Sequence, residues 1–329
     1  MKIAVFSTKS YDQEYFEKYN TAYDYNFSFF ETALNPDTAK LSADCDVVCV
    51  FVNDLVNEET IKILSSNGIK LIALRCAGYN NVDLDAAKKA NIKVVRVPAY
   101  SPEAVAEHAL ALILTLNRKT HKAYNRVREG NFSLKNLIGF NLSNKTIGVI
   151  GTGKIGATFC AILKGFGCRI IAYDISENEE LVAMGVEFHS LEEVFKQSDI
   201  ISLHCPLNQH TKHRVNKESI DLMKSGVMII NTSRGALIKT EDAILGLKDR
   251  KIGYLGIDVY EQEENLFFED LSEHIIQDDM ILRLLSFPNV LITSHQAYFT
   301  KEAMNQITVI TLDNIKDFEN NNELTNEVV

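Results

Sequence analysis

Short β-rich runs alternate with helical patterns along the first hundred residues. The runs occupy positions 3–6, 47–52, 71–74 and 93–97, and helical patterns at 58–66 and 83–90 lie between them. Alternation of this kind is typical of a parallel sheet covered by helices, because each parallel neighbour is reached through a crossover segment. We therefore expect an α/β domain in this part of the chain.

A long helical pattern follows, from Pro102 to about residue 128. Pro102 suits the first turn of a helix, and Ser101 before it is a candidate N-cap. The early part, residues 105–116, is apolar on nearly every side. Such a helix must be covered all round, so it is either central or shared with a second subunit. We favour a domain or subunit interface.

The alternation of strands and helices restarts at residue 146. Strand-like runs occupy 146–150, 169–173, 200–204, 227–231, 254–258 and 290–293. With helices between most of them, these runs predict a second doubly wound unit. The last pattern, from residue 301 to about 318, is an amphipathic helix. Because it follows a complete second unit, we expect it to pack on the first domain and to make that domain discontinuous.

Length and composition fit two folded domains. A chain of 329 residues exceeds what one hydrophobic core usually organises, and the cleft between two domains is a natural active site. Hydrophobic residues make up 46% and charged residues 24%, as in ordinary globular proteins. These proportions argue against wholesale disorder.

The net charge of −10 argues against nucleic acid or an anionic membrane as a partner, since both favour a basic face. An anionic substrate would then be held by local cations. The apolar run at the start of the chain is too short for a signal peptide, and no stretch approaches the roughly 18 apolar residues of a membrane span. We therefore expect a cytoplasmic protein with no membrane partner.

The six cysteines include no CxxC pair and lie in apolar or strand-like surroundings, which suits reduced thiols. Cys205 lies near His204, His210 and His213, but this group lacks the paired-ligand spacing of a zinc site. We expect structural histidines here and no metal.

A glycine-rich segment joins the strand at 146–150 to a helical pattern. Its sequence, Gly151-Thr152-Gly153-Lys154-Ile155-Gly156, has the GxGxxG spacing in the strand, turn and helix context that dinucleotide binding requires. Gly151 permits a tight turn, Gly153 lets the backbone approach a pyrophosphate, and Gly156 allows the helix to pack closely. The helix N-terminus adds free amides and a positive dipole end for the phosphates.

An acidic residue ends the next strand, about twenty residues further on, as in dinucleotide sites. The Asp174 carboxylate is placed to accept hydrogen bonds from the adenosine ribose, and its charge would repel a 2′-phosphate. A glycine-rich turn without a ligand accounts less well for strand, helix and acid together. The cofactor that we expect is NAD rather than NADP.

Three later strand ends carry groups suited to the reduction of a 2-keto acid. That reaction needs an anchor for the carboxylate, a group that polarises the carbonyl, and an acid that protonates the new alkoxide. Arg234 follows the strand at 227–231 with a forked guanidinium, and His295 follows the last strand. The strand at 254–258 is followed by an acidic run at 261–264. A histidine that faces a carboxylate forms a dyad whose imidazolium is stabilised.

Each of these residues also has a plainer interpretation. Arg234 can belong to a surface salt bridge, a histidine at a strand end is more often structural than catalytic, and an acidic run is usually a solvated face. The pattern leaves open which of Glu261, Glu263 and Glu264 meets the histidine.

Motifs that cover essentially the whole chain carry a resemblance to a known family. Besides the glycine-rich loop they lie at 75–83, 97–103, 204–207, 231–235, 256–263, 266–270 and 295–297. In this number and order they resemble the D-isomer-specific 2-hydroxyacid dehydrogenases, and within them the fermentative D-lactate dehydrogenase branch. The resemblance implies two doubly wound parallel-sheet domains: a discontinuous flavodoxin-like catalytic domain, residues 1–100 plus 299–329, and a Rossmann NAD-binding domain, residues 101–298.

The resemblance also implies a role for each matched position. Arg234 would bind and polarise the substrate, His295 would be the acid/base, and Glu263 would be its partner. Backbone amides around Ala77 and Gly78 would hold the substrate carboxylate, and the Tyr100 hydroxyl would contact it. Beside Gly151, Gly153 and Gly156, the NAD site would be lined by Lys154, Ile155, Asp174, Cys205, Pro206, Thr211, Thr232, Ser233 and Asp258.

Two positions depart from the pattern of the wider family. Glu264 and Ser294 stand where proline is frequent, and both also resemble the lactate branch. The expected reaction is the reduction of pyruvate to D-lactate with NADH, in a homodimer or homotetramer. One alternative is a dehydrogenase for larger 2-keto acids, with selectivity set by pocket residues such as Phe51, Tyr100 and Tyr298. A non-catalytic, nucleotide-sensing scaffold is a second alternative, against which the complete set of reaction residues speaks.

Overall fold

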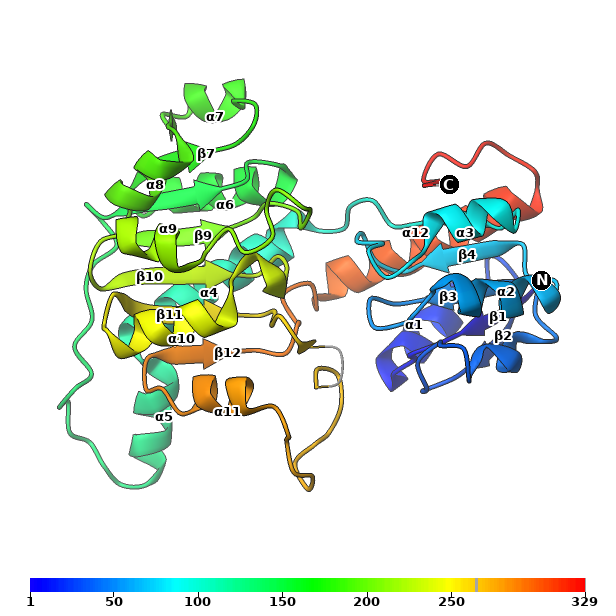
Figure 1. The fold of residues 1–329 in the computed structure, drawn as a ribbon, viewed down its shortest axis with the longest axis horizontal. Coiled ribbons are helices and arrows are strands. Elements are labelled where there is room, and N and C mark those ends of the chain that lie inside the picture. Colours follow the sequence, from blue (N-terminus) through cyan, green and yellow to red (C-terminus); the bar gives the residue numbers. More distant parts are fainter. Residues whose placement is uncertain (264–265, 329) are drawn as a thin grey trace. The chain divides into compact units, whose positions relative to one another are not determined.

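All ten predicted strands form, and with two further strands they make two separate parallel sheets (Figure 1). The structure is a computed structural model that describes residues 1–263 and 266–328. It divides into one unit that comprises Met1–Ser101 and the chain from Phe299 onward, and a second unit, Pro102–Tyr298. The predicted fold class, two parallel-sheet α/β domains, is confirmed.

The sheet of the first unit has the strand order β2-β1-β3-β4-β5, which is the flavodoxin-like order. Its strands are β1 (Lys2–Val5), β2 (Asn26–Phe29), β3 (Val47–Val50), β4 (Leu71–Leu74) and β5 (Lys93–Val95). The accompanying helices are α1 (Ser10–Asn20), η1 (Ala39–Ser42), α2 (Glu58–Ser66), α3 (Leu84–Lys89) and α12 (Lys301–Glu319).

Successive residues of these strands are buried on opposite faces of the sheet. Val47 packs in one apolar cluster with Leu312 and Ile315 of α12, whereas Val48 packs in another with Ile61 of α2. Strands that are covered on both faces read as continuous apolar runs, which is why the sequence pattern found them. Helix α12, the last of the chain, contacts α1 and β4 of this first unit.

The sheet of the second unit has the order β12-β11-β10-β9-β6-β7-β8, a Rossmann order extended by one strand. Its strands are β6 (Thr146–Ile150), β7 (Arg169–Tyr173), β8 (Glu187–Phe188), β9 (Ile200–Leu203), β10 (Val227–Asn231), β11 (Ile252–Ile257) and β12 (Val290–Ile292). Its helices are α4 (Pro102–Arg118), α5 (Thr120–Arg128), α6 (Lys154–Lys164), α7 (Glu179–Ala183), α8 (Leu191–Gln197), α9 (Lys217–Leu222), η2 (Gly235–Leu237), α10 (Thr240–Lys248) and α11 (Asp279–Leu285).

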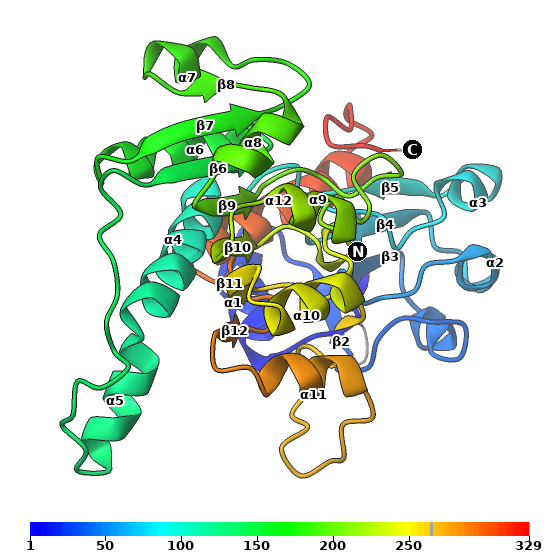
Figure 2. The same ribbon diagram turned by 60° about the vertical axis from the view of Figure 1, so that its left-hand side comes forward.

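The predicted long helix is two helices. Lys119 has a left-handed φ of 51°, so α4 ends at Arg118 and α5 begins directly after Lys119 (Figure 2). Helix α4 contacts α6, β10 and β11, so its apolar surface is covered largely within its own unit. None of the helices within the described ranges is long and apolar enough to cross a membrane.

Candidate active site

The candidate residues of the second unit lie along one edge of its sheet, where the carboxyl ends of the parallel strands meet. The loops after β7, β6, β9, β10, β11 and β12, in the order of the sheet, carry Asp174, the glycine loop, Cys205, Arg234, Glu263 and His295. The chain runs outward from β6 in one direction and returns to β9 on its other side, and ligands of doubly wound sheets bind at such a switch point. The glycine loop and Asp174 therefore lie toward one end of this edge, and Glu263 and His295 lie toward the other.

The glycine loop meets the steric demands of a dinucleotide site. Gly151 has a φ of +96°, and a Cβ on it would lie 2.6 Å from the backbone nitrogen of Cys205. A Cβ on Gly156 would lie 2.0 Å from the carbonyl oxygen of Gly151, so α6 packs directly on the turn. Gly153, in contrast, has no atom of the described residues within 4 Å of its Cβ position and precedes α6 without a side-chain cap. The backbone amides there are open to phosphate groups.

Asp174, after β7, bonds back to the glycine loop. Its Oδ2 accepts hydrogen bonds from the Thr152 backbone nitrogen at 2.5 Å and from Thr152 Oγ1 at 2.8 Å. Its Oδ1 accepts from the Ile175 nitrogen at 2.7 Å. A carboxylate has about four acceptor sites, so capacity remains for a ribose hydroxyl. The sequence gives no indication of this contact, because the x positions of GxGxxG, among them Thr152, carry no signal of their own.

Polar and thiol groups beside the glycine loop also fit a nucleotide. Thr232 Oγ1 is buried and bonds to no group within residues 1–263 and 266–328, as expected of a hydroxyl that a ligand would satisfy. The Ser233 hydroxyl, in contrast, donates to the Leu203 carbonyl oxygen at 2.9 Å. Burial raises the pKa of the Cys205 thiol to about 11, so this side chain offers a neutral surface. The donor set and the open glycine turn fit NAD.

The other predicted cofactor residues lie on the same edge. Lys154 and Ile155 form the start of α6, and Pro206 follows β9. Thr211 Oγ1 donates to the Pro206 carbonyl oxygen at 2.7 Å, which closes the loop after β9.

Glu263 meets His295. The Nδ1 of His295 lies 2.8 Å from Glu263 Oε1, and Glu263 Oε2 accepts from the Tyr260 nitrogen at 2.8 Å. The two side chains are only 14% and 16% exposed. Because an ionised carboxylate only accepts, Nδ1 carries the proton in this contact. The Nε2 of His295 makes no hydrogen bond within the described part of the chain, so it is the ring nitrogen that a substrate can reach.

The other candidates for that pairing lie elsewhere. Glu261 pairs with His213, with 2.5 Å between Oε1 and Nε2, and Glu264 lies outside the described residues. The remaining histidines of the loop after β9 have protein partners as well: His204 Nε2 lies 2.8 Å from Ser202 Oγ, and His210 Nε2 lies 3.2 Å from Gln209 Nε2.

Asp258 holds the loop that carries His295. The side chain of Asp258 is fully buried, and its Oδ1 accepts from Thr293 Oγ1 at 2.5 Å and from the Gln296 nitrogen at 3.0 Å. Its Oδ2 accepts from the Ala297 nitrogen at 2.8 Å, and its carbonyl oxygen from the His295 nitrogen at 2.7 Å. His295 has a left-handed φ of 53°, a conformation that persists only where its surroundings enforce it.

His108 of α4 joins this network, although no motif of the sequence marks it. Its Nε2 lies 3.0 Å from Thr293 Oγ1 and 3.4 Å from Asp258 Oδ1. Burial by itself would raise the pKa of Asp258, but the hydrogen bonds from His108 and Thr293 outweigh it and lower that pKa. Asp258 thus stays ionised while it organises the loop.

Two aromatic rings lie beside the His295 imidazole. The ring of Tyr298, which is buried, meets it edge-on with centroids 6.5 Å apart. The ring of Phe268 lies 5.7 Å away at a tilted angle. Phe268 belongs to a motif of the sequence analysis that had no assigned role, and its left-handed φ of 69° is visible only in the structure. The imidazole thus has two aromatic rings as neighbours besides the Glu263 carboxylate.

Arg234 stands in the loop between β10 and η2. Its Nη1 donates to the Ser233 carbonyl oxygen at 2.7 Å, and Asn231 Nδ2 donates to the Arg234 carbonyl oxygen at 2.9 Å. Within the described residues the guanidinium forms no ion pair with a carboxylate, so the salt-bridge interpretation finds no support there. Its donors remain for an anion.

The predicted carboxylate-binding residues belong to the first unit, in the loop after β4. The amide nitrogens of Ala77 and Gly78 donate to no group of the described residues, whereas the Ala77 carbonyl oxygen accepts from Arg96 Nη1 at 2.8 Å. The Arg96 guanidinium also lies over the Tyr79 ring, 5.1 Å from its centroid. Tyr100 is half-buried in the segment that leads to α4. The loop therefore presents two adjacent amide donors.

Comparison with known proteins gives a consistent result. A family model described as D-isomer specific 2-hydroxyacid dehydrogenase, NAD binding domain, matches residues 110–297. A 2-hydroxyacid dehydrogenase homolog of Haemophilus influenzae is 54% identical over 315 residues, which cover 96% of this chain and 95% of that protein. The D-lactate dehydrogenase of Escherichia coli is 51% identical over 329 residues, 100% of each chain. The apo-structure of the Escherichia coli D-lactate dehydrogenase matches with a TM-score of 0.92 at 49% identity and covers 100% of both chains.

Proposed function

The chain belongs to the D-isomer specific 2-hydroxyacid dehydrogenase family, and from that premise we propose that it interconverts pyruvate and D-lactate. It is an NAD-dependent oxidoreductase of 2-hydroxyacids. The observation that carries the lactate proposal is the contact between His295 and Glu263. Two aromatic rings lie beside His295, and the same edge of the sheet also carries Arg234. A relative that is half identical over its whole length and is named a D-lactate dehydrogenase supports the same substrate.

We propose that His295 is the acid/base of the reaction. NADH, held by the glycine loop and Asp174, would supply the hydride for C2 of the keto acid. The proton for the ketone oxygen comes from Nε2 of the His295 imidazolium, while Nδ1 keeps its hydrogen bond to Glu263. The two transfers turn the ketone into an alcohol, and His295 regains its proton from solvent. In the reverse direction the same nitrogen accepts the hydroxyl proton.

The other proposed roles follow from charge and geometry. The Arg234 guanidinium offers forked donors to the carboxylate and carbonyl oxygens of the substrate and stabilises the charge that develops on the latter. The amides of Ala77 and Gly78 and the Tyr100 hydroxyl bind the substrate carboxylate, which makes the first unit the substrate domain. Tyr298 helps to limit the size of the substrate side chain.

A panel of 2-keto acids tests the choice of substrate. NADH oxidation is followed at equal enzyme concentration with pyruvate, 2-ketobutyrate, 2-ketoisocaproate and phenylpyruvate, and each product is analysed on a chiral column. We expect kcat/KM to be highest for pyruvate and the product to be the D-isomer. One methylene changes discrimination by only about 1–3 kcal/mol, so neighbouring acids retain activity. A higher kcat/KM with a branched or aromatic acid would reassign the substrate class without changing the family.

We also propose that the protein is a homodimer or homotetramer in the cytoplasm. The segment after α5 exposes large apolar side chains, with Phe132, Leu134 and Ile138 at 74%, 82% and 85% exposure. Such a segment is typical of a protein contact. Light scattering on the purified protein, compared with a variant that carries serine at these three positions, tests the assembly: we expect a lower mass for the variant. Six free cysteines suit a reducing compartment.

A further inference from the structure

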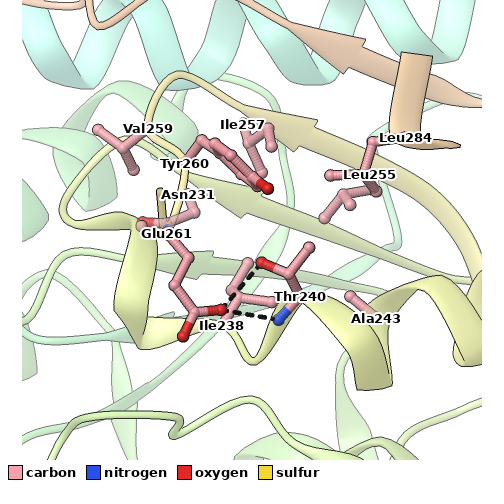
Figure 3. Close-up of a pocket in the computed structure, with 11 residues that line it drawn as sticks. Asn231, Ile238, Thr240, Ala243, Leu255, Ile257, Val259, Tyr260, Glu261 and Leu284 are labelled. Atoms are coloured by element: carbon pink, nitrogen blue, oxygen red, sulfur yellow. Dashed lines mark hydrogen bonds between the residues drawn. The ribbon is translucent and has the colours of Figure 1, made fainter. Parts of the chain in front are cut away.

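A second histidine–glutamate pair lies in the second unit, close in sequence to the reaction residues. His213 Nε2 lies 2.5 Å from Glu261 Oε1, and the side chains are 31% and 22% exposed. The other oxygen of Glu261, Oε2, accepts hydrogen bonds from the Thr240 nitrogen at 3.1 Å and from Thr240 Oγ1 at 3.0 Å. Figure 3 shows Glu261 extending from its loop to Thr240 at the start of α10. One carboxylate thus joins three segments of the chain.

Each of these segments is connected to a reaction residue. Glu261 stands two positions before Glu263, on the turn whose Tyr260 nitrogen donates to Glu263 Oε2. Thr240 begins the helix that follows the Arg234 loop, and the preceding residue provides no side-chain cap for that helix. The Glu261 carboxylate therefore caps α10 from a distant loop and favours its positive dipole end.

The Arg234 loop and the Glu263 turn are also in direct backbone contact. A Cβ on Gly235 would lie 2.0 Å from the Tyr260 carbonyl carbon and 2.4 Å from the Glu261 nitrogen, so no side chain fits between them. On the other side, the His213 nitrogen donates to the Ala236 carbonyl oxygen at 2.8 Å. Gly235 and Ala236, the two residues after Arg234, are thus held between the segments that Glu261 and His213 join.

We infer that His213 and Glu261 are positioning residues. Their contact holds the loop that carries Arg234 and the turn that carries Glu263 in the relative position that the reaction requires. The inference rests on the proposed roles of Arg234 and of the His295–Glu263 pair. A charged Glu261 is essential to it, because only a carboxylate accepts from His213 and from Thr240 at the same time. Burial by itself would raise the pKa of Glu261, but the hydrogen bonds from His213 and Thr240 outweigh it and lower that pKa.

The surroundings leave little room for a substitute contact. The cavity beside the Thr240 and Glu261 side chains is lined mainly by apolar groups, among them Leu255 and Ile257, and has space for about one water molecule (Figure 3). A neutral amide at position 261 keeps only one of the two acceptor oxygens that face His213 and Thr240, and the apolar lining offers no substitute partner. The two loops would shift, and small displacements of positioned groups reduce rates strongly.

A set of full-length variants tests this inference. Glu261→Gln keeps the size of the side chain but replaces one acceptor by a donor, and His213→Leu removes the donor to Glu261. We expect each to lower kcat/KM for pyruvate by roughly 10- to 100-fold, mostly through KM, because Arg234 is displaced. The double variant should be no worse than either single one, since both break the same contact. His213→Gln, which retains an N–H donor, should remain within about threefold of the wild type in kcat/KM.

Controls separate positioning from a general loss of structure. NADH affinity, measured by fluorescence, should fall by much less than kcat/KM in all variants, because the glycine loop and Asp174 follow β6 and β7 and keep their contacts. Asp199 is a matched carboxylate at the amino-terminal ends of the strands, directly before β9. It accepts hydrogen bonds from the Thr146 nitrogen and from Lys224 Nζ, each at 2.9 Å. Asp199→Asn should lower the melting temperature and leave kcat/KM unchanged.

Several results would overturn the inference: unchanged kcat/KM in Glu261→Gln, additive losses in the double variant, or a parallel loss of NADH affinity. Arg234→Lys, measured alongside, distinguishes a failure of the positioning role from a failure of the proposed role of Arg234. If Arg234→Lys is impaired and Glu261→Gln is not, the positioning role alone is wrong. If Arg234→Lys has wild-type kinetics, the proposed role of Arg234 in binding the substrate is itself wrong.

Discussion

His295 Nδ1 lies 2.8 Å from Glu263 Oε1, although 32 residues separate the two in the chain. The contact forms because β11 and β12 are parallel neighbours, so the loops that follow them leave the same edge of the sheet. It orients the imidazole by one ring nitrogen and leaves the other for the substrate. The glycine loop and Asp174 lie toward the other end of the same edge.

Replacing His295 with alanine should reduce kcat for pyruvate by roughly 10²–10⁴-fold, because a positioned acid contributes about that much. NADH binding, followed by fluorescence, should be nearly unchanged. His189→Ala is the matched control: this histidine pairs with Glu187 at the β8 end of the sheet, and its loss should not affect kcat. Near-normal turnover in His295→Ala would exclude it as the acid.

Glu263→Gln should move the pH at which pyruvate reduction falls to half its maximum to a lower value. The imidazolium of His295 loses its counter-charge while the hydrogen-bond geometry is kept, so the protonated form is less stable. Initial rates at saturating NADH between pH 5 and 9 provide the measurement. A profile that coincides with that of the wild type would remove Glu263 from the dyad.

Arg234→Lys keeps the positive charge but loses the planar fork of donors. KM for pyruvate should therefore rise steeply and kcat should fall. Arg283→Lys serves as control, because Arg283 of α11 lies over the Phe287 ring and takes no part in the proposed reaction. Wild-type kinetics in Arg234→Lys would contradict bidentate binding.

Asp174 should exclude NADP through its charge. Asp174→Ser is expected to weaken NADH binding and to narrow the gap between NADH and NADPH, because the repulsion of the 2′-phosphate is removed. Dissociation constants for both cofactors, determined by fluorescence titration of wild type and variant, test this directly. A wild-type enzyme that prefers NADPH would refute the role of Asp174.

Acid should destabilise the fold through His204. Burial lowers the pKa of His204 to about 3, whereas an exposed histidine of an unfolded chain titrates near 6.5. Between these values the unfolded chain binds a proton that the folded chain does not. The contribution to stability is therefore complete above about pH 6.5 and is lost as the pH falls, by about 1.4 kcal/mol per unit.

Urea unfolding of wild type and His204→Gln at several pH values between 8 and 4.5 measures this contribution. The difference in unfolding free energy between the two proteins should be constant above about pH 6.5 and should shift in favour of the variant below it. Parallel curves over the whole range would show that another group governs the acid sensitivity.

The sequence predicted those features that follow from local chemistry or from burial on both faces of a sheet. Buried parallel strands appear as continuous apolar runs, so ten strands were identified, whereas the partly exposed edge strands β2 and β8 were missed. The break between α4 and α5 was also missed, because it depends on the backbone angle of one residue, Lys119. The glycine loop was recognisable since its steric demands select glycine itself.

By itself the sequence thus determined the two α/β domains, the nucleotide loop and the strand ends at which reaction residues stand. Only the tertiary structure decided that Glu263 faces His295 while Glu261 faces His213, and that Thr152, His108 and Phe268 lie beside the candidate residues. The physical reason is that local patterns record burial and backbone demands, whereas the choice between neighbouring carboxylates depends on the order of the strands and on how the loops turn after them.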